Sequence, residues 1–144
     1  MVLLELNHLR LYYKTVRGIV RAVDDVDLNV ESGEAVGVVG ESGCGKTSMA
    51  NAIIKMLPSN VALYDGRIIL DGLNIVDLPE DEVRRKVRWR QISIVFQGAM
   101  NVLNPVIKVG HQVAEPLIIH AEMDRDEAYT VSYTHLTLPT NREV

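Results

Sequence analysis

Short apolar runs separated by glycine-rich turns make up the first part of the chain. From residue 26 to residue 30 apolar and polar positions alternate, which predicts a strand buried on one face. Residues 35–39 carry almost no polar side chain, which is typical of a strand covered on both faces, as in parallel sheets. Apolar positions then recur at helical spacing up to Leu57, and Pro58 marks where that helix must stop. The predicted order is therefore strand, loop, helix.

Two more short strands are predicted further along, with a polar helix between them. Residues 66–70 form the first of these strands, and an Asp71-Gly72 turn closes it. Pro79 suits the first position of the helix, in which acidic residues precede basic ones, as the helix dipole favours. Residues 92–96 are the second strand, and their apolar character predicts that it is buried.

A loop and a further helix are expected next. Residues 97–105 show no periodicity, which indicates a loop. Apolar residues at helical spacing from Val106 to Leu117 predict a helix that is disturbed at Pro116.

The last fifteen residues differ in character from the rest. Asp124 and Glu127 resemble a capping box that would open a new helix. The continuation is rich in threonine and contains Pro139, and these residues are weak helix formers or breakers, so we expect no helix there. One interpretation of residues 130–144 is a strand or disordered tail. The other is a non-native tail, because the amino-acid sequence of this segment resembles translated sequencing-adapter read-through.

Composition narrows the class of protein. The 144 residues suit one domain, and 15 Lys plus Arg against 19 Asp plus Glu give a net charge of −4, which argues against binding to nucleic acid. We expect a cytosolic chain, because no apolar run approaches the roughly 18 residues of a membrane span and the start lacks a signal-peptide layout. Cys44 is the one cysteine, so no internal disulfide can form.

The strongest chemical signal is the segment GESGCGKT, which matches the phosphate-binding loop pattern G-x-x-x-x-G-K-[ST]. It lies between a buried-strand pattern and a helix pattern, as the motif requires. Glycines let the backbone N–H groups curl toward a phosphate, and the helix adds its positive end. Lys46 would reach the β and γ phosphates, the Thr47 hydroxyl would bind Mg²⁺, and Ser48 could contact the α phosphate. The predicted nucleotide-binding loop residues are Gly40, Glu41, Ser42, Gly43, Cys44, Gly45, Lys46, Thr47 and Ser48.

Further segments are collinear with one known family. They are AVDDVDLNVESGEAVGVVGESGCGKT, DGRIILDG, ISIVFQGAMNVLNP and VAEPL, in that order. On these segments, about residues 1–129 resemble the ATP-binding subunits of ABC transporters, most closely the oligopeptide and dipeptide importer branch. The resemblance implies an α/β fold: a partial P-loop NTPase of the ABC type, with an antiparallel β strip and the start of a helical subdomain.

The resemblance also assigns roles and a domain layout. Tyr13 falls where the family stacks an aromatic ring on adenine, with Tyr12 as the adjacent alternative. Gln97 resembles the Q-loop glutamine, which contacts Mg²⁺ or the attacking water and is thus both a metal and a catalytic candidate. Residues 1–100 would form the ATPase core and residues 101–129 the start of the helical subdomain, which in the family docks on a transmembrane permease subunit.

The implied function is ATP-driven peptide import, with ATP and Mg²⁺ as cofactors. A second ATP-binding subunit and permease subunits would be its partners at the cytoplasmic face of the membrane, where the chain would be peripheral.

Several family motifs are missing from the printed sequence. They are the Leu-Ser-Gly-Gly-Gln signature, the Walker B strand with its catalytic glutamate, and the switch histidine. We therefore expect the N-terminal part of a longer ATPase, which binds ATP and does not hydrolyse it. Two alternatives remain at this point: a soluble P-loop kinase, and a noncatalytic nucleotide-binding module.

Overall fold

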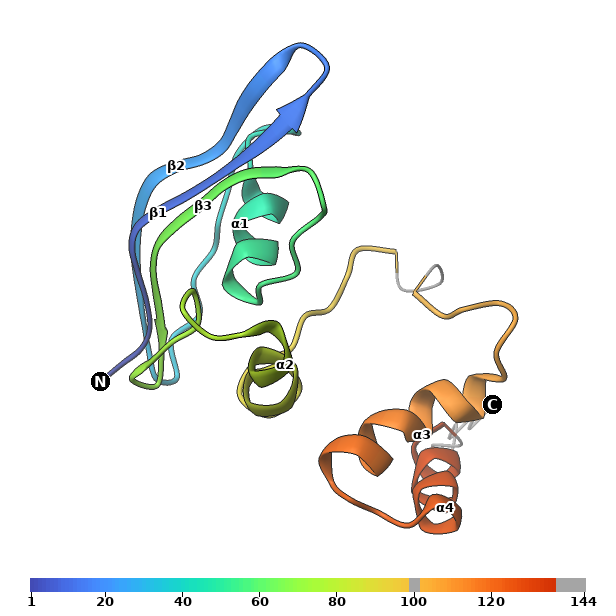
Figure 1. Ribbon diagram of the computed structural model, residues 1–144. Coiled ribbons are helices and arrows are strands. Elements are labelled where there is room, and N and C mark those ends of the chain that lie inside the picture. The colour runs from blue at the N-terminus through green and yellow to red at the C-terminus, as the bar shows by residue number, and fades with distance from the viewer. Residues whose placement is uncertain (99–101, 137–144) are drawn as a thin grey trace, which may run out of the picture. The chain divides into compact units, whose positions relative to one another are not determined.

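The computed structural model describes residues 1–98 and 102–136. The chain divides into two compact units, Met1–Arg88 and Trp89–Val144, each of which is described by itself (Figure 1). The first unit is a sheet with a helix against it, and the second contains a pair of helices. Among the described residues, no helix has the length and apolar character needed to span a bilayer.

The sheet of the first unit is antiparallel, with strand order β2-β1-β3-β4. Its strands are β1 (Val2–Thr15), β2 (Gly18–Glu31), β3 (Val61–Leu70) and β4 (Leu73–Asn74). A tight turn joins β1 to β2, and the Thr15 hydroxyl donates to the Gly18 carbonyl at 2.8 Å across it. The predicted strands at 26–30 and 66–70 are thus confirmed as the ends of longer strands. The predicted turn at Asp71-Gly72, between β3 and β4, is confirmed as well.

A bulge in the middle of β1 determines which side chains enter the core. Leu6 pairs with Leu28 and Leu9 with Val26, so β1 contains one residue more than β2 between the two pairs. The extra residue lets Leu6 and Leu9 both point inward, and each is fully buried. His8 lies at the bulge with a φ of 50°.

Gly66 of β3 lies against this bulge. Its φ is +101°, and a Cβ there would come within 2.5 Å of the His8 carbonyl oxygen. The neighbouring atoms are backbone, so they cannot rotate away as a flexible side chain could. The bulge in β1 therefore requires glycine in the strand beside it.

Helix α1 (Lys46–Ile53) forms where the apolar spacing predicted it and ends before Pro58. Its Ala52 is fully buried. The Tyr64 hydroxyl, from β3, donates to the Ala52 carbonyl at 2.9 Å, and burial raises the pKa of Tyr64 well above its usual value. These contacts hold the helix against the sheet.

The predicted polar helix is present in two short parts, α2 (Glu80–Glu82) and the π-helical η1 (Val83–Val87). Pro79 precedes the first turn as its cap residue, one position earlier than predicted. Val83 and Val87 are fully buried, which fixes the inner face of this segment.

Two predictions of buried strands are wrong. Residues 35–39 and 93–96 have no regular secondary structure, and Ile92 forms only a single bridge. Val39 is 95% exposed and Val95 is 92% exposed. A strand covered on both faces needs parallel neighbours, whereas the sheet in the described residues has four antiparallel strands and none beside these segments.

Helix α3 (Val109–His120) opens the helical pair of the second unit. It begins at Val109 and not at Val106, because the Gln112 side chain binds the loop before the helix. The Gln112 Nε2 donates to the Ile107 carbonyl at 2.8 Å, and the Gln112 Oε1 accepts from the Asn104 N–H at 2.7 Å. Pro116 lies inside the helix without ending it. The predicted loop before α3 is confirmed for residues 97, 98 and 102–105, and residues 99–101 lie outside the described part.

Helix α4 (Arg125–Leu136) corrects the expectation that no helix follows Asp124. The Asp124 carboxylate accepts from the Asp126 N–H at 3.0 Å and caps the helix. The hydroxyls of Thr130, Ser132 and Thr134 each donate to the carbonyl four residues earlier, so these polar side chains are satisfied within the helix.

Packing explains why α4 forms despite its weak propensity. Ala128 and Ser132 are buried, as is Ala114 of α3, and contacts between the two helices stabilise both. Residues 137–144, which hold Pro139 and most of the expected tail, lie outside the described part of the chain.

The contact at the bulge yields a stability prediction. Gly66→Ala should lower the free energy of unfolding by more than about 1 kcal/mol, because the new methyl group meets the β1 backbone at a positive φ. Gly72→Ala is the matched control, since Gly72 also has a positive φ (+80°) and nothing lies within 4 Å of its Cβ position. Urea denaturation of both variants should show the larger loss for Gly66→Ala, and equal losses would contradict the bulge contact.

Candidate phosphate-binding site

The loop before α1 is curled around the side chain of Lys46. The Lys46 Nζ donates to the Gly40 carbonyl at 2.7 Å and to the Glu41 carbonyl at 2.6 Å. The Cys44 Sγ lies 3.4 Å from the same nitrogen. A positive charge is thus held inside the turn of the loop, next to the first turn of the helix.

Three glycines allow this curl. Gly43 and Gly45 have φ values of +82° and +99°, in the region that other residues avoid. A Cβ on Gly45 would lie 2.1 Å from the Ala22 carbonyl oxygen of β2, and one on Gly40 would lie 2.6 Å from the Cys44 Sγ. The loop is therefore in close contact both with the sheet and with itself.

The start of α1 completes an anion-binding surface. Gly45 is the cap residue, and its carbonyl accepts the first helical hydrogen bond, from the Met49 N–H at 2.8 Å. The N–H groups of Lys46, Thr47 and Ser48 come before that bond, so the helix supplies them with no acceptor. Thr47 is exposed and Ser48 is half-buried. Donors, a cation and the positive helix end together fit a phosphate group.

A divalent cation fits this site only in the company of an anionic ligand. The described residues contain no group of three or more His, Cys, Asp or Glu side chains that could hold a metal ion. The Thr47 hydroxyl is a single hard oxygen ligand, and Mg²⁺ commonly combines such a ligand with phosphate oxygens.

The two adjacent tyrosines of β1 have different surroundings. The Tyr12 hydroxyl donates to Asp24, which raises the pKa of Tyr12 and lowers that of Asp24, and the Arg21 guanidinium lies 5.5 Å from the Tyr12 ring centre. Tyr13 is half-buried and lines a cavity of about 650 Å³ together with Asn51, Lys55, Met56, Leu57, Pro58, Glu80 and Arg88. Tyr12 is therefore engaged by its own sheet, and Tyr13 faces an open volume.

Strand register relates Tyr13 to the loop. Tyr13 pairs with Val20 of β2, and Gly45 contacts Ala22 of the same strand. Two residues of a strand span about 7 Å, so the position of β2 that pairs with Tyr13 lies about 7 Å along the strand from the position that contacts Gly45. The residues that share the cavity with Tyr13 come from the end of α1 and beyond it, whereas the loop precedes the start of that helix.

Gln97 belongs to the second unit, and the loop belongs to the first. It is exposed in a segment without regular structure. Its assignment to Mg²⁺ or to the attacking water stays a prediction from the resemblance.

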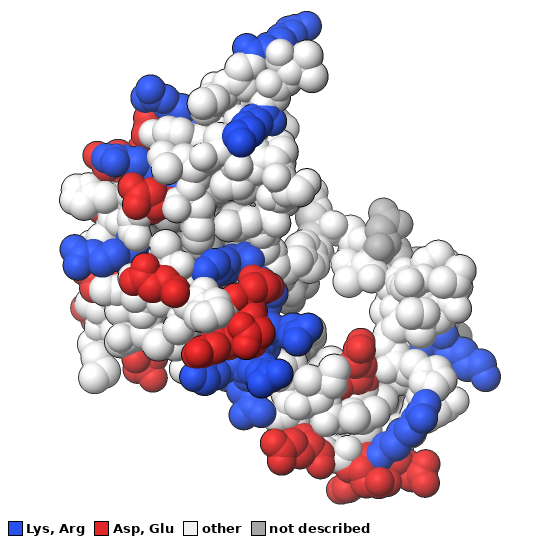
Figure 2. Space-filling view, in the orientation of Figure 1, with Lys and Arg blue, Asp and Glu red and all other residues white. Residues whose placement is uncertain are grey.

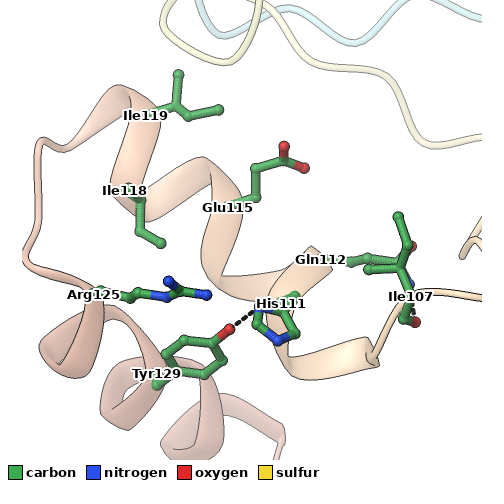
Figure 3. Close-up of a pocket in the computed structure, with 8 residues that line it drawn as sticks. All are labelled: Ile107, His111, Gln112, Glu115, Ile118, Ile119, Arg125 and Tyr129. Carbon is green, nitrogen blue, oxygen red and sulfur yellow. Dashed lines mark hydrogen bonds between the residues drawn. The ribbon is translucent and has the colours of Figure 1, made fainter.

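The helical pair contains a second cavity, of about 390 Å³ (Figure 3). The His111 ring from α3 and the Tyr129 hydroxyl from α4, which both line it, form a hydrogen bond, and Arg125 lies beside them. The remaining lining residues are Ile107, Gln112, Glu115, Ile118 and Ile119. None of the residues predicted to bind nucleotide lines this cavity.

A glycine-rich loop wrapped around its lysine at the start of a helix defines the class of phosphate-loop nucleotide-binding proteins. Within that class, the sequence matches the family described as ABC transporter over residues 23–142, and the chain belongs to this family. The match excludes the soluble kinase alternative. It also runs into residues 130–144, whose non-native origin stays a prediction.

Named relatives are peptide transport proteins. The oligopeptide transport ATP-binding protein OppD of Salmonella typhimurium is 41% identical over 131 residues, which cover 91% of this chain and 38% of that protein. The dipeptide transport ATP-binding protein DppD of Lactococcus lactis is 35% identical over 117 residues, 81% of this chain and 33% of that protein. The chain thus spans about a third of the length of these relatives.

Solved structures confirm the predicted fold class. A dimeric ATP-binding cassette in a post-hydrolysis state, bound to ADP and Pi, is 28% identical with a TM-score of 0.74, over 92% of this chain and 55% of that one. A bacterial ABC transporter cassette is 29% identical with a TM-score of 0.69. The fold is a partial ABC-type nucleotide-binding domain with its antiparallel strip.

One contact that the sequence did not reveal is the approach of Gly45 to Ala22. Gly45→Ala should weaken ATP binding by about tenfold or more, because the added methyl group pushes the loop away from β2. Gly33→Ala serves as the control, since Gly33 has a φ of +80° with open space around its Cβ position and lies outside the loop. Calorimetric titration of both variants tests this, and equal ATP affinities would show that the contact with β2 does not support the loop.

Proposed function

We propose that this chain is the nucleotide-binding part of an ATP-binding subunit of a peptide-importing ABC transporter. The observation that carries the proposal is the Lys46 ammonium, held inside the loop by the carbonyls of Gly40 and Glu41 at the start of α1. In this position the cation and the first-turn N–H groups face the same space, where the β and γ phosphates of ATP would lie.

Each part of the loop has a distinct task in this proposal. Lys46 exchanges its carbonyl contacts for phosphate oxygens, a charge-assisted interaction that is stronger than the neutral one it replaces. Thr47 supplies a hydroxyl to Mg²⁺, with Gln97 as a second ligand and as the group that orients the attacking water. Tyr13 stacks on the adenine, and Ser48 contacts the α phosphate.

Peptide transport is proposed from the names of the relatives. The two relatives above are named for oligopeptide and dipeptide transport. The partners proposed are transmembrane permease subunits and a second ATP-binding subunit, and the proposed location is the cytoplasmic face of the membrane. The dimeric state of the solved cassettes supports the second subunit.

Nucleic acid is not among the proposed partners. The net charge is −4, and Figure 2 shows Lys and Arg side chains interspersed with Asp and Glu on the face in view. This mixture produces no broad positive surface there, which a phosphate backbone would need.

Removal of the loop cation tests the proposal directly. Lys46→Ala should weaken ATP binding by roughly tenfold or more, since a hydrogen bond to a charged group is worth about 1.5 to 3 kcal/mol. Lys86→Ala is the matched control, because it removes the same charge from an exposed ion pair with Glu82 in the polar helix. If folded Lys46→Ala bound ATP as tightly as Lys86→Ala does, the phosphate-loop assignment would be wrong.

Hydrolysis is expected to be absent from the 144-residue chain. ATP binding needs the loop, whereas hydrolysis also needs a base for the attacking water and a second contact on the γ phosphate, which the family takes from motifs missing from the printed sequence. The amide of Gln97 can orient a water but cannot accept its proton. Steady-state phosphate release should equal that of Lys46→Ala, and release well above that variant would contradict the prediction.

A further inference from the structure

The C-terminal end of α1 is held by a cluster of charged side chains. The Arg88 Nε donates to the Ile54 carbonyl at 2.9 Å, and the Arg88 Nη2 donates to the Lys55 carbonyl at 2.6 Å. Carbonyls just past a helix end have no helical donor, so the guanidinium satisfies them and complements the negative end of the helix dipole.

Arg88 also binds the start of α2. Its Nη1 lies 2.6 Å from the Glu80 Oε1 and its Nη2 lies 3.3 Å from the Oε2, a two-pronged contact. The Arg88 side chain is 20% exposed. One partly buried side chain thus joins the end of α1 to the helix that follows β4.

Lys55 reinforces this connection from the other side. Its φ of 54° ends the helix in the left-handed region, and its Nζ donates to the Val76 carbonyl at 2.8 Å and the Leu78 carbonyl at 2.6 Å. Arg88 therefore holds the backbone of Lys55, while the side chain of Lys55 holds the segment that leads to Glu80. We call Lys55, Glu80 and Arg88 the α1 clamp.

The opposite end of α1 lacks a side-chain cap in the part of the chain that the structure describes. The helix has eight residues, and among the described residues no side chain caps its N-terminus and no acidic residue lies in its first turn. A helix this short is marginal without tertiary contacts. Charged side chains therefore lie at both ends of α1: Lys46 at its start and the α1 clamp at its C-terminal end. The two ends are about 12 Å apart along the helix axis.

We propose that Arg88 is a positioning residue for the phosphate loop. By fixing the C-terminal end of α1, the α1 clamp keeps Lys46 and the first-turn N–H groups aimed at the position of the phosphates. This inference rests on the proposed function and adds to it a residue that lies outside the loop motif.

The test compares ATP affinity and thermal stability in the same 144-residue chain. Arg88→Gln should weaken ATP binding by about fivefold or more, the lower end of typical coupling between two sites. Arg88→Lys should recover part of the affinity, because lysine keeps the charge and can donate to the carbonyls but cannot hold Glu80 with two prongs. Lys86→Ala is the matched control: it removes a nearby positive charge from an exposed ion pair with Glu82 and leaves the α1 clamp intact, so it should bind ATP as the wild type does.

The outcomes separate this inference from the proposed function. If Arg88→Gln lowered the melting temperature and bound ATP as the wild type does, the α1 clamp would only stabilise the fold, and the inference would be wrong. Lys46→Ala, titrated alongside, reports on the proposed function: a loss there with no loss in Arg88→Gln overturns only the inference. Should Arg88→Gln fail to fold, Glu80→Gln decides, with weaker ATP binding expected and wild-type affinity overturning the proposal.

Discussion

The hydrogen bonds from the Lys46 ammonium to the carbonyls of Gly40 and Glu41 are the contacts on which the site depends. A multiply charged phosphate is best held by backbone dipoles and one cation, since both can be arranged before the ligand arrives. By binding two carbonyls of its own loop, Lys46 draws the chain into a curve. The first turn of α1 then lies beside the charge, so a single short segment supplies both the donors and the cation.

The rest of the first unit serves to keep that segment in place. Gly45 rests against the carbonyl of Ala22, which sets the loop on β2 at one point. The bulge in β1 directs Leu6 and Leu9 into the core beneath the sheet, and Gly66 makes room for it. At the far end of α1, Arg88 donates to the carbonyls of Ile54 and Lys55, the two residues that follow the helix. The helix is thus fixed at both ends, although it is too short to be stable alone.

Local patterns predicted the parts of this structure that depend on neighbouring residues. The phosphate loop, α1 and the Asp71-Gly72 turn follow from short-range geometry, and all three are present. The strands predicted at 35–39 and 92–96 depend on parallel partners far along a chain, which the described sheet does not contain. Helix α4 was missed because its threonines and Ser132 have weak propensity, and packing against α3 outweighs that.

The same distinction applies to the site. The motif predicted the loop residues and their chemistry, but it gave no sign of the contact with Ala22 or of the α1 clamp. Both join residues more than twenty positions apart, and an isolated arginine or alanine in a sequence carries no periodic signal. Gln97 lies in the other unit, so its role depends on the family resemblance alone.

Backbone amide NMR during an ATP titration would show directly where the nucleotide binds. The largest shifts should fall on the N–H groups of residues 43–48, with smaller ones near Tyr13, because phosphate oxygens accept hydrogen bonds from the first group and adenine stacks on the second. Shifts confined to the cavity between α3 and α4, with residues 43–48 unmoved, would contradict binding at the phosphate loop.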